Sequence, residues 1–142
     1  MTRAQLVRLL RESRLAVVST VGPGGAPQSA VVGCAVSDEL EVVFDTLDST
    51  RKAANLRRDP RVSAVIGWDR EMTAQLEGVA DFPDGDELER IRAVYFQAHP
   101  DGRDRLAWPG LVHVRIRPRW IRWSDFVQRP PFIFESEVAR LG

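Results

Sequence analysis

The segment "GPGGAP", residues 22–27, constrains the fold of this 142-residue chain more than any other. Its glycines and prolines interrupt any helix, so they mark a turn between the two apolar runs that flank them. Those runs, residues 14–21 and 27–36, are rich in valine, which favours strands. The segment also lacks the spacing of a phosphate-binding glycine loop and does not open a helix. The sequence therefore predicts a β-hairpin over residues 14–36.

Further strands are predicted from the spacing of apolar residues. They span residues 40–46, 61–68, 72–82 and 111–123, which brings the expected total to six. In the first of these, apolar and polar side chains alternate, which indicates one buried face formed by Leu40, Val42 and Phe44. Pro118 cannot donate to a central ladder, so the last strand should have an edge or a bulge there.

Two helices are predicted outside the strands, near the start of the chain and before the last strand. Residues 3–13 carry an apolar stripe at helical spacing. Their arginines also fit an organelle transit peptide, but the segment runs without a break into the first strand. The other helix lies within residues 83–100, with Asp84 or Asp86 as its cap and acidic residues in its first turn.

The connections indicate the class of fold. Short spacings with hairpin turns favour a small antiparallel barrel or sandwich, and only one early connection is long and helical enough for a parallel βαβ unit. We expect a single domain over residues 1–142, because a chain of this length supports one core. The tail, residues 125–142, should be partly extended. Its Phe132, Ile133 and Phe134 need a surface to cover, and a neighbouring subunit is one candidate.

Charge and composition argue against several classes of protein. The 20 basic and 20 acidic residues balance, so no global field attracts nucleic acid or an anionic membrane. Charged residues at 28% and hydrophobic residues at 44% argue against disorder. No apolar run approaches the roughly 18 residues of a membrane helix. The single cysteine, Cys34, cannot form an internal disulfide, which favours a cytoplasmic location.

Cations are concentrated in one segment, "STRKAANLRRDPRVS", residues 49–63. It predicts a helix that is capped by Ser49 and ends near Asp59, because a proline follows Asp59 and disfavours helical geometry before it. Arg57 and Arg58 lie in the last turn, where the helix dipole favours positive charge. We therefore expect these two arginines to form an ordinary solvated face.

Arg51 and Lys52 break the usual charge preference of a helix. They lie in its first turn, where the dipole disfavours a cation by up to about 1 kcal/mol. A bound anion would remove the conflict, because the free N–H groups and both side chains would converge on it. Lys52 is also the only lysine among the 20 basic residues. The sequence thus predicts a phosphate-like ligand at Arg51 and Lys52, with a solvated pair of cations as the alternative.

The remaining reactive residues indicate no catalytic apparatus of the protein's own. There is no catalytic triad and no pair of carboxylates placed for acid–base work, so any chemistry must come largely from a cofactor. Cys34 has no cation nearby in sequence and is expected to be a buried, inert thiol. His99 and His113 are far apart and lack metal-ligand spacing, so no metal is assigned.

The order of the motifs "VVFDTLDSTRKAANLRRDPRVSAVIGW", "LEGVA" and "YFQAHP" resembles the pyridoxamine 5'-phosphate oxidase-like family of FMN-binding split barrels. The resemblance covers residues 15 to 124. It implies a mainly β (α+β) fold, with a six-stranded antiparallel split β-barrel and two to three peripheral helices. It also implies that Arg51 and Lys52 hold the FMN phosphate, and that two FMN sites lie at the interface of a homodimer.

The same resemblance implies further cofactor contacts. Asp45 and Thr46 match positions along the phosphate and ribityl chain, although the family's oxidases often have an aromatic residue where Asp45 stands. Ser49 at the helix start is one contact, and the strand that carries Ala30, Val31 and Val32 faces the isoalloxazine ring with its backbone. Either Thr73 or Gln75 of the fifth strand reaches the flavin. Trp123 lies near the flavin edge, with packing in the barrel as the alternative. The contacts implied beyond Arg51 and Lys52 are Ala30, Val31, Val32, Asp45, Thr46, Ser49, Thr73, Gln75 and Trp123.

The substrate positions depart from the family pattern. Oxidases that act on pyridoxamine phosphate hold its phosphate with a lysine, a tyrosine, an arginine and a serine. Ala35, Tyr95, His99 and Arg103 stand at the matching positions, so only the tyrosine is kept, and the late Arg-x-His motif is absent. The resemblance therefore implies a relative with another substrate, for which Tyr95 and His99 are the expected contacts.

The expected function is that of a cytoplasmic, homodimeric FMN-dependent oxidoreductase with an unknown small-molecule substrate. One alternative is a deazaflavin-dependent reductase of the same fold. Another is a flavin- or haem-binding protein without turnover. Arg115, Arg117 and Arg119 alternate along the last strand and could meet RNA, but no aromatic residues interleave them in the pattern of a single-strand binder, so a solvated face is favoured. Neither nucleic acid nor a membrane is an expected partner.

Overall fold

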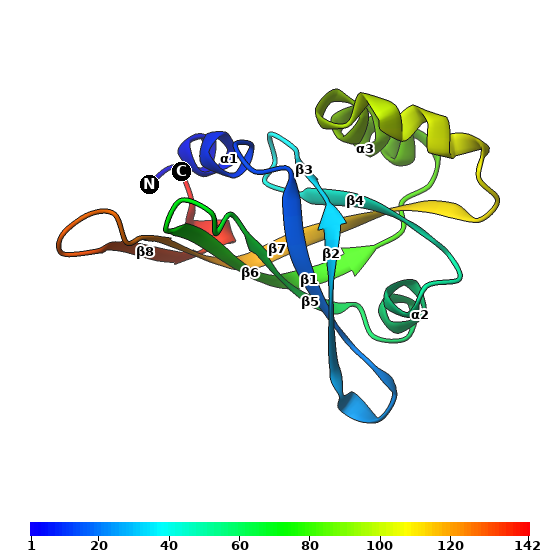
Figure 1. Cartoon of the computed structure of the whole chain (residues 1–142), viewed down its shortest axis with the longest axis horizontal. Coiled ribbons are helices and arrows are strands. Elements are labelled where there is room, and N and C mark those ends of the chain that lie inside the picture. The colour runs from blue at the N-terminus through cyan, green and yellow to red at the C-terminus, as the bar shows by residue number, and fades with distance from the viewer.

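A curled antiparallel sheet forms most of the molecule (Figure 1). The computed structural model describes the whole chain, residues 1–142. The strands are β1 (Leu15–Val21), β2 (Pro27–Gly33), β3 (Ala35–Val36), β4 (Val42–Leu47), β5 (Arg61–Ile66), β6 (Met72–Asp81), β7 (Leu111–Asp125) and β8 (Phe132–Glu137). Their order is β2-β1-β5-β6-β7-β4-β3, and β8 pairs with β7. This mixed, mostly β half-barrel confirms the predicted fold class and is consistent with a split barrel.

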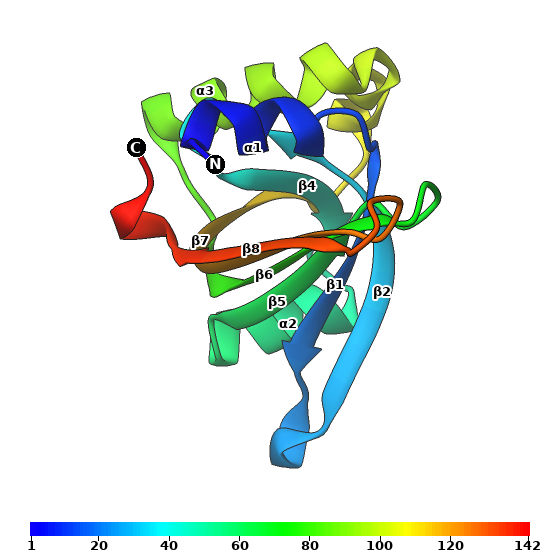
Figure 2. The ribbon, with the colours of Figure 1, turned by 90° about the vertical axis from the view of Figure 1, so that its left-hand side faces the viewer.

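Three α-helices surround the sheet, at the upper end of the number predicted. They are α1 (Arg3–Leu10), α2 (Arg51–Arg58) and α3 (Gly85–Ala98). Three 3-10 segments also occur: η1 (Pro23–Gly25) between β1 and β2, η2 (Pro100–Ala107) after α3, and η3 (Val138–Arg140) after β8. Figures 1 and 2 show α1 and α3 above the sheet and α2 below it. None of the helices combines the length and the apolar character needed to cross a membrane.

Two helix boundaries refine the predictions. Helix α1 stops before residue 13, because the amides of Glu12 and Ser13 bond to carbonyls three residues earlier and close the helix as a tight turn. Helix α2 ends at Arg58 with Asp59 as its C-cap, as predicted. Asp84 occupies the N-cap position of α3, although its side chain makes no capping hydrogen bond.

The sheet has eight strands rather than six, because the second predicted strand changes partners. Its first part, β2, pairs with β1, and the Cys34 amide still bonds to the Arg14 carbonyl. One residue later Ala35 pairs with Val43 of β4, at the other end of the sheet. This crossing links the two end strands of the curled sheet. The predicted extended tail supplies the other new strand, β8.

Strand β7 is long enough to serve two parts of the molecule. Residues 111–116 pair with β4, and residues 120–125 pair with β8 in a projecting arm. Between them the register against β6 shifts near Pro118, which confirms the predicted bulge. Gly78 lies opposite, and a Cβ there would come within 2.2 Å of the Arg117 carbonyl oxygen, so only glycine permits this approach.

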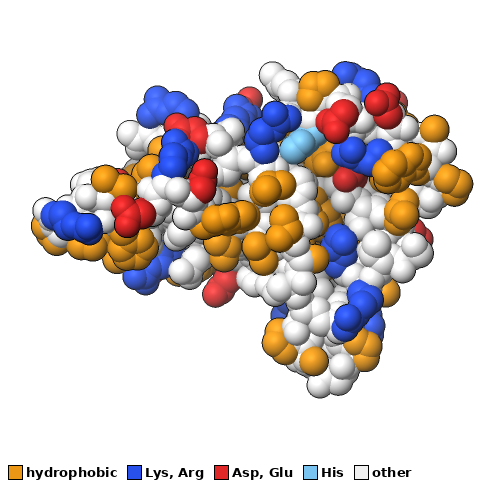
Figure 3. All heavy atoms as spheres, in the orientation of Figure 1, with side chains coloured by type: hydrophobic (Ala, Val, Ile, Leu, Met, Phe, Trp, Pro, Cys, Tyr) orange, Lys and Arg blue, Asp and Glu red, His pale blue; other side chains and the backbone are white.

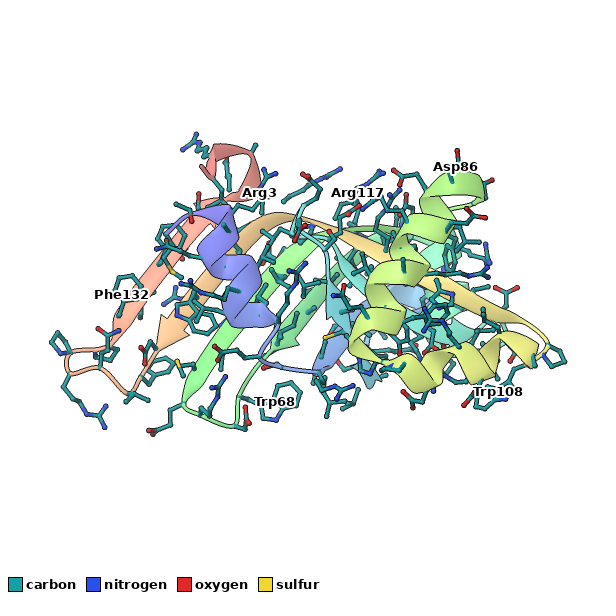
Figure 4. The ribbon with its side chains drawn as sticks, turned by 90° about the horizontal axis from the view of Figure 1, so that it is seen from above. Arg3, Trp68, Asp86, Trp108, Arg117 and Phe132 are labelled. Carbon is teal, nitrogen blue, oxygen red and sulfur yellow. The ribbon has the colours of Figure 1, made fainter.

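The arm leaves part of the tail uncovered. Phe134 packs against the barrel core, whereas Phe132 and Ile133 are exposed. Figure 4, seen from above, shows α1 and α3 in front of the strands, with Phe132 on the arm at one end of the molecule and Trp108 at the other. The tail is therefore only partly covered by its own barrel.

Strand β4 is buried on both faces, contrary to the single buried face that its alternation predicted. Phe44 points into the barrel core, which α1 covers from above. Val43 points the other way, into a second cluster that includes Ile91 and Tyr95 of α3. The prediction failed because α3, which packs from a distant part of the sequence, covers the face that local alternation assigns to solvent.

Arg115 also differs from its prediction as part of a solvated stripe. Its side chain is only 4% exposed, and it pairs with Asp81 at 2.6 Å and with Glu41 at 3.3 Å. Arg117 and Arg119 remain exposed. The stripe therefore does not exist as three solvated arginines, because α3 covers the first of them.

A network of charges around the buried Glu41 and Arg115 ties α3 to the sheet. Arg90 of α3 donates to both carboxylate oxygens of Glu41, at 2.9 and 2.8 Å, and Ser37 donates at 2.7 Å. Burial alone would raise the pKa of Glu41, but these hydrogen bonds, with the charges of Arg90 and Arg115, outweigh it and lower the pKa. The ionised carboxylate therefore stabilises the folded state.

Replacing Glu41→Gln should lower the free energy of unfolding by about 2 kcal/mol at neutral pH. The loss is smaller than that for a wholly uncompensated buried charge, about 3–5 kcal/mol, because Asp81 still pairs with Arg115. Since the folded pKa is lowered, the contribution is present above the unfolded pKa of about 4.3 and fades as the pH falls below it. Urea unfolding at several pH values measures this difference.

The matched control is Glu89→Gln, an exposed position of α3 without an ion pair. It should leave stability unchanged at every pH. A Glu41→Gln deficit that does not shrink at acid pH would contradict the role given to the ionised carboxylate.

Candidate cofactor site

A cavity of about 410 Å³ lies where the β1–β2 hairpin meets the start of α2. We call it the α2 cavity. Figure 1 shows α2 beside the lower half of this hairpin. The lining residues come from three elements and the loop before α2: Val18, Thr20, Gln28, Ser29, Ala30, Ser49, Thr50, Arg51 and Lys52. Four of the residues predicted to contact a cofactor, Arg51, Lys52, Ser49 and Ala30, are thus brought together.

The two cations of the α2 cavity have no partners within the chain. Of the 20 basic side chains, only Arg8, Arg51, Lys52 and Arg119 make no hydrogen bond, salt bridge or cation–π contact. Arg57 of the same helix shows the contrast, since it pairs with Asp48 at 2.7 Å and lies over the Phe82 ring. Arg51 and Lys52 are adjacent, so the α2 cavity presents two uncompensated charges to any ligand.

The start of α2 adds backbone donors to these charges. Thr50, not the predicted Ser49, is the N-cap: its hydroxyl accepts from the Ala53 amide and donates to the Leu47 carbonyl. The prediction was one residue early, because both residues have capping side chains. The amides of Arg51 and Lys52 make no hydrogen bond within the chain. Such free amides at the positive end of a helix favour an anion.

Of the three residues of strand β2 predicted to face the cofactor with their backbone, only Ala30 lines the α2 cavity. Val31 points to the outer face of the sheet and is 62% exposed, whereas Val32 is buried in the barrel core. The difference follows from the alternation of side chains along a strand.

Strand β4 separates the other predicted pair. Thr46 is buried and its hydroxyl lies 3.0 Å from that of Thr50, so it supports the cap of α2. Asp45 points to the opposite face, where it accepts from the Tyr95 hydroxyl at 3.1 Å and from Arg105 at 2.8 Å. Only Thr46 is therefore close to the α2 cavity.

The remaining predicted contacts lie toward the other end of the strands. Thr20, at the cavity, is level with Gly78 of β6, whereas Trp123 pairs with Ala74, nearer the α1 end. Trp123 is buried in the core, and Thr73 and Gln75 flank Ala74 with their side chains on the outer face. A single chain does not bring these three residues to the α2 cavity.

The two predicted substrate contacts form a separate cluster under α3. Tyr95 is 1% exposed, and His99 stacks on its ring at a centroid distance of 4.8 Å. Burial, followed by the charge of Asp45, raises the pKa of Tyr95 to about 12, so the phenol stays neutral and donates. Arg105 of η2 also donates to this hydroxyl. The cluster fixes η2 against α3 and does not open into the α2 cavity.

The histidines and the cysteine lie near this cluster. His99 Nε2 lies 2.8 Å from the Cys34 carbonyl oxygen, and burial lowers the pKa of His113 to about 4, so it is neutral at physiological pH. Burial also raises the pKa of Cys34 to about 12, which confirms the buried, inert thiol. No group of three or more His, Cys, Asp or Glu residues is arranged to hold a metal ion.

A sequence model of the family described as "Pyridoxamine 5'-phosphate oxidase" matches residues 2–123. The chain belongs to this family. It is 31% identical over 124 residues to the pyridoxine/pyridoxamine 5'-phosphate oxidase of Citrobacter koseri, covering 86% of this chain and 55% of that protein. The Cronobacter sakazakii oxidase is 30% identical with the same coverage. The chain thus spans about half the length of the curated relatives it matches.

Solved structures share the fold of this family member. A conserved hypothetical protein, Rv2991 of Mycobacterium tuberculosis, is 29% identical, with a TM-score of 0.72 over 88% of this chain and 85% of that one. A heme binding protein of Mycobacterium smegmatis has a TM-score of 0.82, 22% identity and coverages of 98% and 59%. A pyridoxamine 5'-phosphate oxidase-related, FMN binding protein of Nostoc punctiforme has a TM-score of 0.71, 15% identity and coverages of 95% and 86%. The last two are similar in fold alone.

Sequence reasoning missed the polar floor of the α2 cavity. Asn55 is 2% exposed, and its Nδ2 donates to Thr20 Oγ1 at 2.9 Å and to Gln28 Oε1 at 2.7 Å. A signal was present, because Asn55 is the only asparagine of the chain and lies one turn after Arg51 on the same helix face. Arg58 was expected to be merely solvated, but it donates to Asn55 Oδ1 and to the Val21 carbonyl.

The position of the cap can be tested with two neighbouring substitutions. Thr50→Ala should lower the free energy of unfolding by about 1 kcal/mol, because it removes the hydroxyl that accepts from the Ala53 amide. Ser49→Ala should leave it unchanged, since the Ser49 side chain makes no hydrogen bond. Chemical denaturation of both variants gives the comparison. Equal losses, or a larger loss for Ser49→Ala, would show that Ser49 caps the helix.

Proposed function

We propose that this protein is an FMN-binding flavoprotein that acts as a flavin-dependent oxidoreductase on a small molecule. The observation that carries the proposal is the pair of unpartnered cations, Arg51 and Lys52, beside free amides at the start of α2. A terminal phosphate supplies the acceptors and the negative charge that this arrangement lacks. Membership of the family and the FMN binding relative of the same fold support the same cofactor.

The α2 cavity has the size and chemistry to anchor such a group. Its volume of about 410 Å³ is in the range of small-molecule sites, roughly 300–1,000 Å³. When bound, FMN supplies hydride or electron transfer, which the chain's own side chains cannot. The contribution of Arg51, Lys52 and the helix start is to bind the phosphate and fix the position of the cofactor.

Haem and a deazaflavin cofactor fit the α2 cavity to different degrees. Haem requires an iron ligand such as His, Cys, Met or Tyr, and none of these residues lines the α2 cavity. A deazaflavin cofactor also carries phosphate and would use the same cations. Titration of the purified protein with FMN and with a deazaflavin cofactor, followed by fluorescence, compares the two affinities directly.

Oxidation of pyridoxamine phosphate is not part of the proposed function. Alanine has no donor for a phosphate, and Arg103 lies 5.1 Å from the Phe96 ring centroid, so the lysine and serine that the resemblance implies for such oxidases are not present at these positions. The chain also spans only about half of those oxidases. Tyr95 and His99 remain candidate substrate contacts, although in a single chain they contact each other and not the α2 cavity.

The phosphate anchor is tested by the double variant Arg51→Ala/Lys52→Ala. Each lost charge-assisted hydrogen bond is worth about 1.5–3 kcal/mol, so the dissociation constant for FMN should rise at least about 100-fold. Fluorescence quenching of FMN during titration measures this constant, and circular dichroism checks that the variant is folded.

The control is Arg8→Ala/Arg117→Ala, which removes the same total charge from two exposed positions outside the α2 cavity. It should bind FMN as the wild type does. If both double variants bind FMN equally well, the phosphate has been assigned to the wrong place.

We also propose that the protein is a homodimer. The outer face of β1 and β2 carries Leu15, 48% exposed, and Val31, 62% exposed, with Val17 half-buried between them. Figure 3 shows hydrophobic side chains gathered in the middle of this face. A second copy would cover them, and it would also supply residues to cofactor sites that one chain leaves incomplete, since Thr73 and Gln75 face outward and lie away from the α2 cavity.

The dimer is tested by Val31→Arg, which places a charge in the middle of the proposed interface. The wild type should have about twice the chain mass of 16.0 kDa by light scattering, and Val31→Arg should be monomeric. Leu106→Arg, an equally large change at an exposed apolar side chain of η2, should remain dimeric. A monomeric wild type would refute the proposal.

A further inference from the structure

The orientation of the buried Asn55 amide is fixed by Arg58. Arg58 Nη2 lies 3.1 Å from one atom of that amide, and a guanidinium has only donors to offer. The atom that faces Arg58 must therefore be the carbonyl oxygen. The amino group of Asn55 then points the other way, toward the β1–β2 hairpin.

The Asn55 amino group in turn fixes the two side chains it meets. Its protons go to Thr20 Oγ1 at 2.9 Å and to Gln28 Oε1 at 2.7 Å, so both oxygens act as acceptors. The proton of the Thr20 hydroxyl finds no acceptor within the chain, although the residue is only 3% exposed. The Gln28 amino group also has no partner, and it lies where a Cβ on residue 22 would come within 2.7 Å, so Gly22 makes room for it.

The consequence is that the α2 cavity presents donors from its floor as well as from its rim. Thr20 and Gln28 add an O–H and an N–H to the side chains and amides of Arg51 and Lys52. An ionised phosphate has acceptors only and carries the opposite charge, so it matches these donors in hydrogen-bond polarity and in charge. A neutral hydroxyl terminus satisfies few of them and leaves the cations unpaired.

We propose that Asn55, oriented by Arg58, is a positioning residue that sets the hydrogen-bond polarity of the α2 cavity and so makes it select a phosphate-terminated ligand over the same ligand without its phosphate. The choice of FMN as that ligand rests on the proposed function. The polarity argument holds for any phosphate. A purely structural Asn55, which only ties α2 to the hairpin, would affect ligands with and without phosphate alike.

The test is Asn55→Asp, which keeps the shape of the side chain and its contact with Arg58 but replaces the amino group by an acceptor. Thr20 and Gln28 would then donate to residue 55 and turn their protons away from the ligand. The ratio of the riboflavin to the FMN dissociation constant should fall at least about tenfold, while riboflavin affinity changes less than about twofold. Gln97→Glu, the same change of charge at an exposed position of α3, should leave the ratio unchanged.

A second test removes one donor without adding charge, and it uses two variants of Thr20. Thr20→Val should also lower the ratio, by up to about tenfold, because it deletes the buried hydroxyl while keeping its shape. Thr20→Ser should restore the wild-type ratio. If Asn55→Asp does not fold, this pair decides the matter, since an unchanged ratio in Thr20→Val overturns the proposal.

Failure of the proposed function can be told apart from failure of this inference. If the wild type binds neither FMN nor riboflavin, the function is wrong, and inorganic phosphate becomes the probe. At the same phosphate concentration, the melting temperature of the wild type and of Thr20→Ser should then rise more than that of Asn55→Asp or Thr20→Val. Equal responses in all four proteins, or none in the wild type, would overturn the role of Asn55.

Discussion

The crossing of the chain from β2 to β3 is the constraint on which the rest of the structure depends. At one end of the sheet, the Cys34 amide donates to the Arg14 carbonyl. The next residue, Ala35, already pairs with Val43 at the other end. The sheet must curl for both to form. That curl brings the β1–β2 hairpin next to the helix that follows β4, and the α2 cavity is the space between them. The curl of the sheet and the candidate site therefore have one cause.

The protein uses its positive charges in two different ways. Arg115 and Arg90 are balanced by carboxylates and fasten α3 to the sheet, so their charge contributes to the stability of the fold. Arg51 and Lys52 are left unbalanced at the positive end of a helix, an arrangement that costs stability until an anion binds. An anion that binds only the folded state recovers that cost through mass action. The two sets lie on opposite sides of the sheet, which keeps the carboxylates away from the cavity.

The sequence predicted features whose causes are local. The bulge at Pro118 and the cation pair at the start of α2 follow from the chemistry of single residues and their neighbours. The double-sided burial of Val43 and the buried charge of Arg115 were not predicted, because α3 covers both from another part of the chain. Asn55 was missed for a related reason: its partner Thr20 lies 35 residues away, and no local pattern records that contact.

The bulge in β7 also changes which side chains face the core. Before it, the even-numbered Val114 and Ile116 are buried, and after it the odd-numbered Ile121 and Trp123 take their place. The extra residue thus shifts the alternation of inward and outward side chains by one position in the middle of the strand. If the same residues continued the ladder without the bulge, Arg122 would pair with Ala74 and turn inward, and Trp123 would turn outward. The bulge therefore determines which face of the sheet each side chain in the second half of β7 occupies.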